Sequence, residues 1–424
     1  MAVIGTDDTD SRERGQCTTY VARTVAERIR AAGGDIERLL LVRLNPAVPH
    51  KTRGNAALAV HADVDPDEAF RVARDELDGA AETADGNTNP GLVVAPGGPD
   101  AVPDEVAAFA REAMRDHHDI EDATALADDS GYRRAGWQNA RGTIGALAAV
   151  GAWRAVPEWT YEYISYRHPD ARGTPRDVDY DSVFAAADEA YPAAWDTVDR
   201  GEGQAVCVPR TPGPVLHGIR GDDPETVRAV ADRIESEPIE STALFRTNQG
   251  TDAHLRDAAL ADARDGRSYR VDATVADPPA TREGGHVFLT LEDGDAALDC
   301  AAFEPTKRFR DRVRALRADD RVTACGEVAD GTLKLEKFAV RDLNETELVT
   351  PDCPDCGRSM ESAGRDQGYR CRDCGTSADG KVERRVERDL DIGWYEVPPC
   401  ARRHVAKPLV RGGFDAPTHP ERQL

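Results

Sequence analysis

The feature that most restricts how this chain can fold is a cluster of four cysteines near its C-terminal end. Cys353 and Cys356 form one Cys-x-x-Cys pair, and Cys371 and Cys374 form a second. Each pair puts two thiolates on one tight turn, and two such turns can enclose a zinc ion in a tetrahedron of sulfur. Because four sulfur ligands leave no open position on the metal, we expect a structural zinc ribbon.

The residues next to these cysteines support the prediction of a zinc ribbon. Gly357 and Gly375 each follow the second cysteine of a pair, where a residue that tolerates positive φ lets backbone amides turn toward the sulfurs. The other five cysteines are scattered, so we expect no disulfide framework.

Around the four clustered cysteines, cations alternate with one aromatic ring. This composition is compatible with RNA binding and equally with a solvated surface; the residues are Arg358, Arg365, Tyr369, Arg370 and Arg372.

Upstream of the ribbon, the apolar pattern is that of a small β-barrel. Three strand patterns, one helical pattern and two more strand patterns follow one another, at residues 269–275, 287–291, 298–302, 309–316, 322–328 and 333–340. This order is typical of the OB-fold, whose strands and loops often bind oligonucleotides. An unrelated five-stranded β module is the alternative.

The N-terminal part of the chain alternates strand and helix patterns. Val21, Val25 and Ile29 have helical spacing before two glycines. We expect further helices at 66–80 and 103–115, and strands at 3–5, 39–44, 56–60 and 92–95. The pattern favours a layered α/β or α+β architecture.

An acidic loop follows the first expected strand. Asp7, Asp8 and Asp10 lie within four residues, and a helix opens after them near Thr18 and Thr19. Carboxylates this close repel one another, so the cluster is plausible where a hard cation such as magnesium is shared with a nucleotide triphosphate. The hydroxyls at the helix N-terminus would favour an anion. The alternative is an acidic loop with a simple helix cap.

A second polar loop lies between two expected strands, at residues 45–55. It contains Lys51, which is one of only six lysines, together with Arg53 and Gly54. Cations here can hold phosphates against the aspartates. The stretches 141–147 and 246–254 also contain glycines that permit close approach to a ligand, although a loop and a helix cap explain either stretch equally well.

The charge of the chain bears on its source and partners. The formal net charge is −24, with 78 acidic against 54 basic residues. An acidic, lysine-poor surface suits a protein that stays soluble in concentrated salt, so we expect a halophilic source. Phosphate contacts normally come from basic surfaces, but in strong salt binding depends more on arginine forks, stacking and shape. The net charge therefore does not exclude a nucleic-acid partner.

Together these stretches resemble the archaeal tRNA(Ile) 2-agmatinylcytidine synthetase family over nearly the whole chain. The resemblance is carried by GTDDTDS at 5–11, CTTY at 17–20, KTRGN at 51–55, TNQGTD at 247–252 and the ribbon. Residues 214–221 and the triplet RRH at 402–404 are similar too. The resemblance implies a multi-domain α+β protein: an atypical kinase-like α/β catalytic domain at 1–195, a ferredoxin-like domain at 196–264 that could be discontinuous with the first, an OB-fold at 265–346, the zinc ribbon at 347–385 and a C-terminal extension at 386–424.

The resemblance also implies an activity. ATP would phosphorylate the wobble cytidine of the AUA-reading isoleucine tRNA, and agmatine would then displace the phosphate at C2. Asp7, Asp8 and Asp10 would hold magnesium on ATP, and Thr18 would accept a phosphoryl group. We nominate Lys51, Arg53 and Gly54 on physical grounds as phosphate contacts.

Two other functions remain open at this stage. One is a non-catalytic nucleic-acid-binding protein, and the other is an RNA kinase without amine ligation. The sequence has no run of about 18 apolar residues and no signal-peptide pattern, so we expect a soluble cytoplasmic protein with no membrane contact. The implied partners are the tRNA, agmatine and ATP, with no obligate protein partner.

Overall fold

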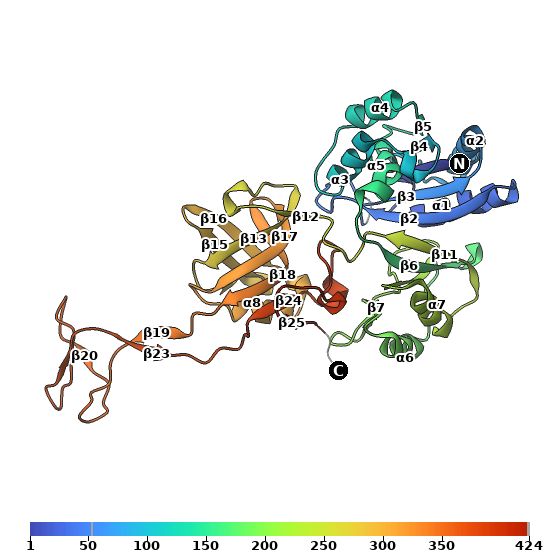
Figure 1. Ribbon diagram of the computed structural model, residues 1–424. Coiled ribbons are helices and arrows are strands. Elements are labelled where there is room, and N and C mark those ends of the chain that lie inside the picture. The colour runs from blue at the N-terminus through green and yellow to red at the C-terminus, as the bar shows by residue number, and fades with distance from the viewer. Residues whose placement is uncertain (52–53, 422–424) are drawn as a thin grey trace.

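The computed structural model describes residues 1–51 and 54–421. Figure 1 shows an N-terminal α/β body in two lobes, a β-barrel beside it, and a small module at the far end of a two-stranded stalk. None of the described helices is both long and apolar enough to cross a membrane.

One mixed sheet of nine strands runs through both lobes of the N-terminal body. Its order is β5-β4-β1-β3-β2-β11-β6-β10-β7. The lobes join where β2 and β11 pair in parallel through only two residue pairs, Arg246 with Leu40 and Thr247 with Leu41. The strands are β1 (Ala2–Asp7), β2 (Asp35–Arg43), β3 (Ala56–Asp63), β4 (Gly91–Pro96), β5 (Arg133–Gly136), β6 (Thr160–Arg167), β7 (Ala194–Trp195), β10 (Val215–Gly221) and β11 (Ile239–Thr247).

Helices cover both faces of the first lobe. α1 and α2 bury one face of the sheet, and α3, α4 and α5 bury the other. In the second lobe, α6 and α7 pack on one face. The helices are α1 (Thr18–Ala31), α2 (Pro66–Ala80), α3 (Asp104–Ala113), α4 (Ile120–Asp129), α5 (Gly142–Ala155), α6 (Tyr180–Ala190) and α7 (Pro224–Arg233). All the helices and strands expected in the first 115 residues are present.

Helix ends are fixed by local side chains. Asp65 precedes α2 and accepts hydrogen bonds from the backbone amides of Asp67 and Glu68, and Pro66 supplies a preset φ at the first helical position. Asp223 and Pro224 begin α7 in the same way. The apolar periodicity of α2, together with Asp65 and Pro66 at its start, explains why the prediction of a helix at 66–80 is correct to the residue.

The barrel has five strands and one helix in the predicted order. β13 pairs with β15 and β17, β15 with β16, β16 with β18, and β17 with β18, so the ring is closed. Its elements are β13 (Arg267–Val275), β15 (Val287–Asp293), β16 (Ala296–Ala302), α8 (Phe309–Arg314), β17 (Arg321–Ala329) and β18 (Thr332–Asp342). Short strands at the margins are β8 (Val198–Asp199), β9 (Gln204–Ala205), β12 (Leu255–Asp257) and β14 (Ala280–Thr281).

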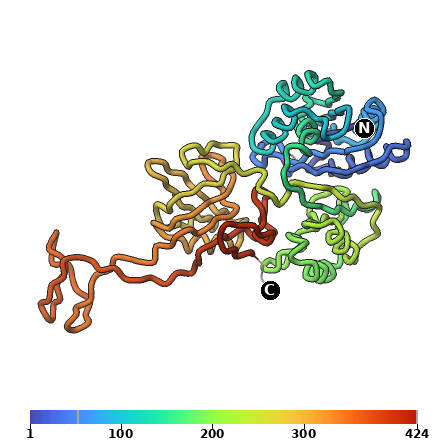
Figure 2. The backbone as a smooth tube through the Cα atoms, in the orientation of Figure 1, coloured from blue at the N-terminus to red at the C-terminus, as the bar shows by residue number. Residues whose placement is uncertain are grey.

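The four-cysteine module is separated from the barrel by a stalk. β19 (Thr346–Val349) and β23 (Val382–Arg385) pair in antiparallel fashion to form the stalk. At its end lies a three-stranded sheet of β20 (Glu361–Ser362), β21 (Tyr369–Arg370) and β22 (Ser377–Ala378). This module projects away from the other parts of the molecule (Figure 2).

After the stalk, the chain returns to the centre of the molecule. β24 (Gly393–Glu396) joins the barrel sheet beside β18, and β25 (Thr418–His419) pairs with β24. Between them, the segment 397–417 crosses to the second lobe of the N-terminal body, where Arg402 pairs with Asp196 at 2.7 Å. The C-terminal segment therefore ties the barrel to the α/β body.

Candidate functional site

The three aspartates of the acidic loop lie at the C-terminal end of β1. Asp7 is the last residue of the strand, and Asp8 takes a left-handed φ of 58°. The amide of Asp8 donates to Asp7 Oδ1 at 2.7 Å. On the other side, α5 approaches so closely that a Cβ on Gly145 would lie 1.9 Å from Asp7 Oδ2. Gly145, in the 141–147 stretch, therefore makes room for the carboxylate of Asp7.

Charge is concentrated at this point of the site. Burial raises the pKa of Asp7 well above its usual value, and the neighbouring Asp8 and Asp10 raise it further. Asp8 Oδ2 accepts hydrogen bonds from Arg141 at 3.0 Å and from the amide of Asn89 at 3.1 Å. A buried carboxylate whose charged form is disfavoured in this way would be stabilised by a cation.

A cavity of about 150 Å³ opens beside these aspartates. Its lining includes Asp7, Asp8 and Asp10 as well as Lys51 and Gly54 from the second polar loop. Burial lowers the pKa of Lys51, and its ammonium contacts the carbonyl of Pro46. The structure thus brings together the two loops that the sequence singled out. Arg53 lies outside the described residues.

Thr18 lines a second, adjoining cavity of about 300 Å³. It is the first residue of α1 and lies with its hydroxyl 3.1 Å from that of Thr9. Asp10, Gly54 and Ala56 line both cavities, so the two meet at Asp10. Thr18 is therefore next to the aspartate site and not inside the same cavity.

The second cavity contains charged residues that no sequence motif had indicated. Glu162 on β6 is buried and lies 3.7 Å from Arg43 and 3.6 Å from Arg220. Glu162 Oε2 has no hydrogen-bond partner. These residues come from three strands of both lobes, so no local sequence motif could have grouped them.

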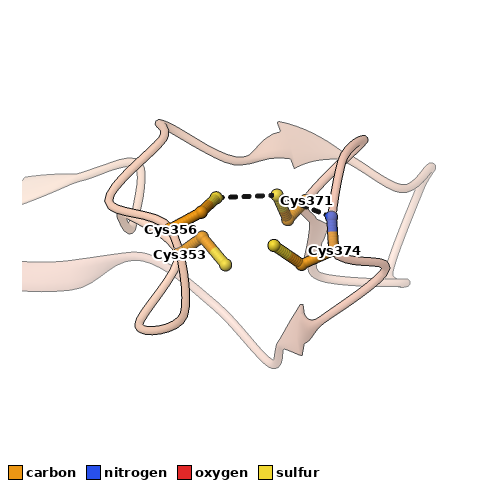
Figure 3. A group of neighbouring side chains, drawn as sticks. All are labelled: Cys353, Cys356, Cys371 and Cys374. Carbon is orange, nitrogen blue, oxygen red and sulfur yellow. Dashed lines mark hydrogen bonds between the residues drawn. The ribbon is translucent and has the colours of Figure 1, made fainter.

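The four cysteines converge as expected (Figure 3). Their sulfur atoms all lie within 4.8 Å of one another. The amides of Gly357 and Gly375 donate to the carbonyls of Cys353 and Cys371, and both glycines have positive φ, 71° and 72°. Among the described residues, no other group of three or more cysteine, histidine or carboxylate side chains is so compact. The arrangement fits a tetrahedral zinc ion.

The alternating cations of the ribbon are partly neutralised. Arg358 pairs with Asp373 at 2.6 Å, and Arg372 contacts Glu361. Both arginines are exposed. They remain accessible on the surface, although each has an acidic neighbour.

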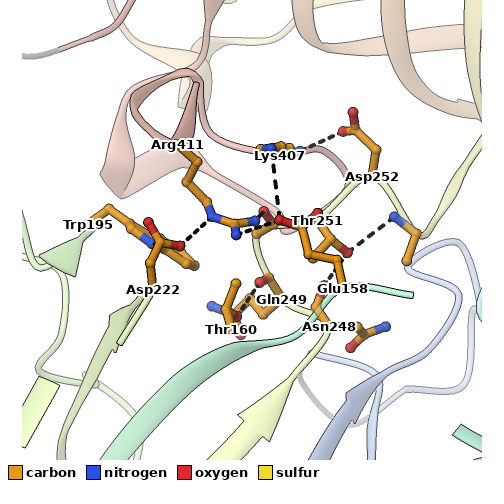
Figure 4. A network of polar contacts seen from close by, with 12 residues as sticks. Glu158, Thr160, Trp195, Asp222, Asn248, Gln249, Thr251, Asp252, Lys407 and Arg411 are labelled. Atoms are coloured by element: carbon orange, nitrogen blue, oxygen red, sulfur yellow. Dashed lines mark hydrogen bonds and ion pairs between the residues drawn. The ribbon is translucent and has the colours of Figure 1, made fainter. Parts of the chain in front are cut away.

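The segment 247–252, which carries part of the family resemblance, lies in a network of polar contacts between several parts of the molecule (Figure 4). The Asn248 side chain bonds the backbone N–H and C=O of Arg43, which lie on β2. Asp252 Oδ1 accepts from Lys337 of the barrel at 3.0 Å and from the amide of Lys407 at 2.7 Å. The segment therefore connects both lobes, the barrel and the C-terminal segment.

Comparison with known proteins places this architecture in a family. Family models match three parts of the chain: the TiaS TCKD domain at 3–139, the TiaS FLD domain at 140–254 and the TiaS C-terminal zinc ribbon domain at 350–390. Together these ranges cover more than half of the sequence. The chain belongs to the TiaS family.

Relatives and solved structures of TiaS agree over full length. The isoleucine-tRNA 2-agmatinylcytidine synthetase TiaS of Haloquadratum walsbyi is 52% identical, and the alignment covers 100% of both chains. The crystal structure of TiaS in complex with its isoleucine tRNA and ATP has a TM-score of 0.89 at 40% identity, covering 99% of each chain. A complex of TiaS with the same tRNA, AMPCPP and agmatine has a TM-score of 0.88 at 37% identity, again covering 99% of each. Similarity to a TiaS from a halophile fits the acidic composition.

Proposed function

We propose that this protein ligates agmatine to C2 of the wobble cytidine of the AUA-reading isoleucine tRNA, using ATP and a phosphorylated cytidine. The observation that carries the proposal is that two cavities meet at Asp10, one lined by the aspartates and the other by Thr18. TiaS relatives bear the matching name, and TiaS structures hold the isoleucine tRNA with ATP or with an ATP analogue and agmatine.

The first cavity is the proposed site for the ATP phosphates. Lys51 and Gly54 line it together with the aspartates, and Arg141 lines it as well, from the N-terminal end of α5. Cations, backbone amides at a helix N-terminus and a glycine that allows close approach are the groups that hold phosphates. We propose Arg53 as a further contact on the basis of its position in the sequence.

Asp7, Asp8 and Asp10 are the proposed magnesium ligands. The raised pKa of buried Asp7, caused by burial and then by Asp8, fits a place where a cation belongs. When bound, magnesium would offset the charge that develops on the phosphates during transfer. Arg141 and the Asn89 amide orient Asp8, since both donate to its Oδ2.

Cytidine and agmatine are assigned to the second cavity. Phosphoryl transfer forms a P–O bond to the C2 oxygen of cytosine and breaks a phosphoanhydride bond of ATP. The primary amine of agmatine then forms a C–N bond at C2, phosphate leaves with the C2 oxygen, and the amine gives up a proton. Thr18 lies beside this path and is the proposed acceptor of a second phosphoryl group. The wobble base must leave its stack to enter the cavity.

We also propose the finer assignments of the two lobes. The first lobe is kinase-like, with the phosphate loops at the ends of its strands. The second is ferredoxin-like: apart from the separate β8-β9 pair, its strands and α-helices come in the order β6-α6-β7-β10-α7-β11, with sheet order β11-β6-β10-β7, which supports a split βαβ topology. This topology would begin the second domain near Thr160, with the OB-fold, ribbon and C-terminal segment following as expected. A cytoplasmic location would bring the enzyme to its tRNA.

The test combines the protein with ATP, agmatine and an unmodified transcript of the AUA-reading tRNA, in salt that keeps the protein folded. Mass spectrometry of the anticodon fragment should show the added mass of agmatine. A fragment that carries only a phosphate would support an RNA kinase instead. Unchanged RNA with no ATP consumption would support a non-catalytic binding protein.

A further inference from the structure

A large arginine-lined groove lies at the seam between the two lobes, away from the proposed active site. Its volume is about 500 Å³, within the range of ligand-sized pockets. It opens because β2 and β11 pair only through Leu40 with Arg246 and Leu41 with Thr247. Before these residues the two strands diverge. α1 and α7 form its walls, and the residues preceding the paired ends of β2 and β11 form its floor.

The groove is cationic in a strongly acidic protein. Five arginines and two glutamates line it, against a net charge of −24 for the chain; the arginines are Arg23, Arg30, Arg38, Arg228 and Arg246. Among the described residues, no carboxylate lies within 4.0 Å of Arg23, Arg228 or Arg246, whereas Arg30 pairs with Glu27 and Arg38 with Glu37. Three guanidinium groups are therefore available to an anion.

Two buried donors in the groove lack acceptors. Arg23 Nε and Arg38 Nη1 are both buried without a hydrogen-bond partner. A buried N–H group without an acceptor destabilises the protein, because it has lost its hydrogen bond to water. Both donors belong to arginines that line the groove.

Aromatic rings lie in and beside the groove. Tyr161 and Tyr163 line the groove. Trp153 adjoins it, with the Arg38 guanidinium 3.9 Å and the Arg246 guanidinium 5.4 Å from its ring centre. Trp159 stacks on Trp153 at 5.7 Å with an interplanar angle of 23°. Arginines that track phosphates beside rings that stack bases are the composition of single-strand-binding surfaces.

The groove is distinct from the proposed catalytic cavities. None of its lining residues lines either cavity. Arg38 in the groove and Arg43 in the second cavity lie on the same strand, five residues apart, which at about 3.3 Å per residue separates them by roughly 17 Å. A ligand in the groove would therefore not occupy the site of ATP or of the reacting base.

We propose that this groove binds a single-stranded RNA segment, with phosphates on Arg23, Arg228 and Arg246 and bases against the neighbouring aromatic rings. The inference rests on the proposed function in that the RNA in question is the tRNA substrate, which the protein would then hold at a second place. Stacking and arginine contacts suit this role in concentrated salt, where long-range attraction is screened.

Binding can be followed through Trp153, because a base stacked nearby quenches indole fluorescence. The full chain is saturated with ATP and agmatine and then titrated with an oligouridylate of about eight nucleotides, a length typical of such surfaces. Quenching is expected in the wild type and should be largely absent in Trp153→Phe. Arg228→Glu, on the exposed side of α7, should weaken the apparent affinity at least ten-fold.

Arg233→Glu is the matched control, because Arg233 lies on the same helix, is exposed and pairs with Glu189 outside the groove. It should leave the affinity within two-fold. A second test variant, Arg246→Gln, keeps much of the side chain's length and guards against misfolding of the charge reversal. Equal weakening by the Arg228 and Arg233 substitutions would overturn the proposal, as would an absence of quenching.

Uridine monophosphate at the same concentration separates RNA from a free nucleotide. If it quenches as strongly as the oligonucleotide, the RNA assignment is wrong and the groove is a nucleotide site. Agmatine transfer to the full transcript of the AUA-reading tRNA is measured in parallel. Its failure in the wild type would refute the proposed function while leaving the oligouridylate titration unaffected, so the two outcomes can be told apart.

Discussion

At the scale of single residues, the aspartate site depends on the absence of side chains as much as on their presence. Gly145 faces Asp7 Oδ2, and Gly142 lies where a Cβ would be 2.8 Å from the carbonyl oxygen of Asp7. α5 can therefore lie directly against the end of β1. Adding one methyl group at Gly145 would move the carboxylate or the helix.

Gly145→Ala should abolish ATP turnover and destabilise the fold by about 1–3 kcal/mol, the usual cost of overpacking. Gly79→Ala is the control: this glycine is in α2, and nothing lies within 4 Å of the place that a Cβ would take, so the change should be neutral or stabilise by up to about 1 kcal/mol. Thermal unfolding and ATP hydrolysis measure both effects. Full activity of Gly145→Ala would show that Asp7 has no part in the reaction.

Asp8→Ala separates chemistry from tRNA binding. Because Asp8 lines the first cavity, its loss should lower ATP turnover by at least about 100-fold while tRNA affinity stays within a few-fold. Asp75→Ala, which removes an exposed partner of Arg71 on α2, should change neither. A collapse of tRNA binding in Asp8→Ala alone would indicate that the loop is structural.

At the scale of elements, prediction from sequence succeeded where the physical signal is local. Alternation and turn residues predict the barrel strands, and cysteine spacing predicts the ribbon, since each depends on residues close in the chain. The pairing of β2 with β11 joins residues about 200 positions apart, and no periodicity encodes it. The buried Glu162 was missed for the same reason, as was the joint formed by Asn248 and Asp252.

The stalk predicts that the ribbon is energetically separate from the α/β body. The core of the ribbon consists of only Cys353, Met360 and Cys371, with Tyr369 and Ala378 packed against them, so its fold depends on zinc. Strong chelation should unfold residues 350–380 without lowering ATP hydrolysis. Hydrogen exchange resolved along the chain measures the first effect, and a nucleotide assay the second.

Cys371→Ser should reproduce the effect of chelation, whereas Cys325→Ser, in the barrel, should leave exchange in the ribbon unchanged. Equal loss of ATP hydrolysis and ribbon structure on chelation would contradict the separation.

At the scale of the whole molecule, the C-terminal segment holds the parts together. Arg411 is almost fully buried and donates to Asp222 at 2.6 Å, to Glu158 at 2.7 Å and to the carbonyl of Gly250 (Figure 4). Gly250 itself has a φ of 72° and lies against Trp195. One guanidinium thus bonds to three separate segments of the α/β body.

Arg411→Ala should destabilise the protein by roughly 1–3 kcal/mol, because it removes charge-assisted hydrogen bonds. The carboxylates that accept these bonds are partly exposed to solvent, which limits the effect. Arg233→Ala breaks an ion pair exposed on both sides and should cost no more than about 0.5 kcal/mol. Denaturant unfolding compares the two. Equal effects would mean that the C-terminal contact contributes no more than an ordinary surface pair.

The path of the chain also sets the order in which the molecule can be completed during translation. The ribbon is made before β24, and β24 and Arg411 are among the last 32 residues, from Gly393 to Leu424. The α/β body can therefore emerge from the ribosome and fold before the C-terminal segment that bridges it to the barrel has been made. A nascent chain that stops at the ribbon has every residue of the proposed catalytic site and the direct contact of Lys337 with Asp252, yet it lacks the C-terminal segment that bridges the barrel and the second lobe.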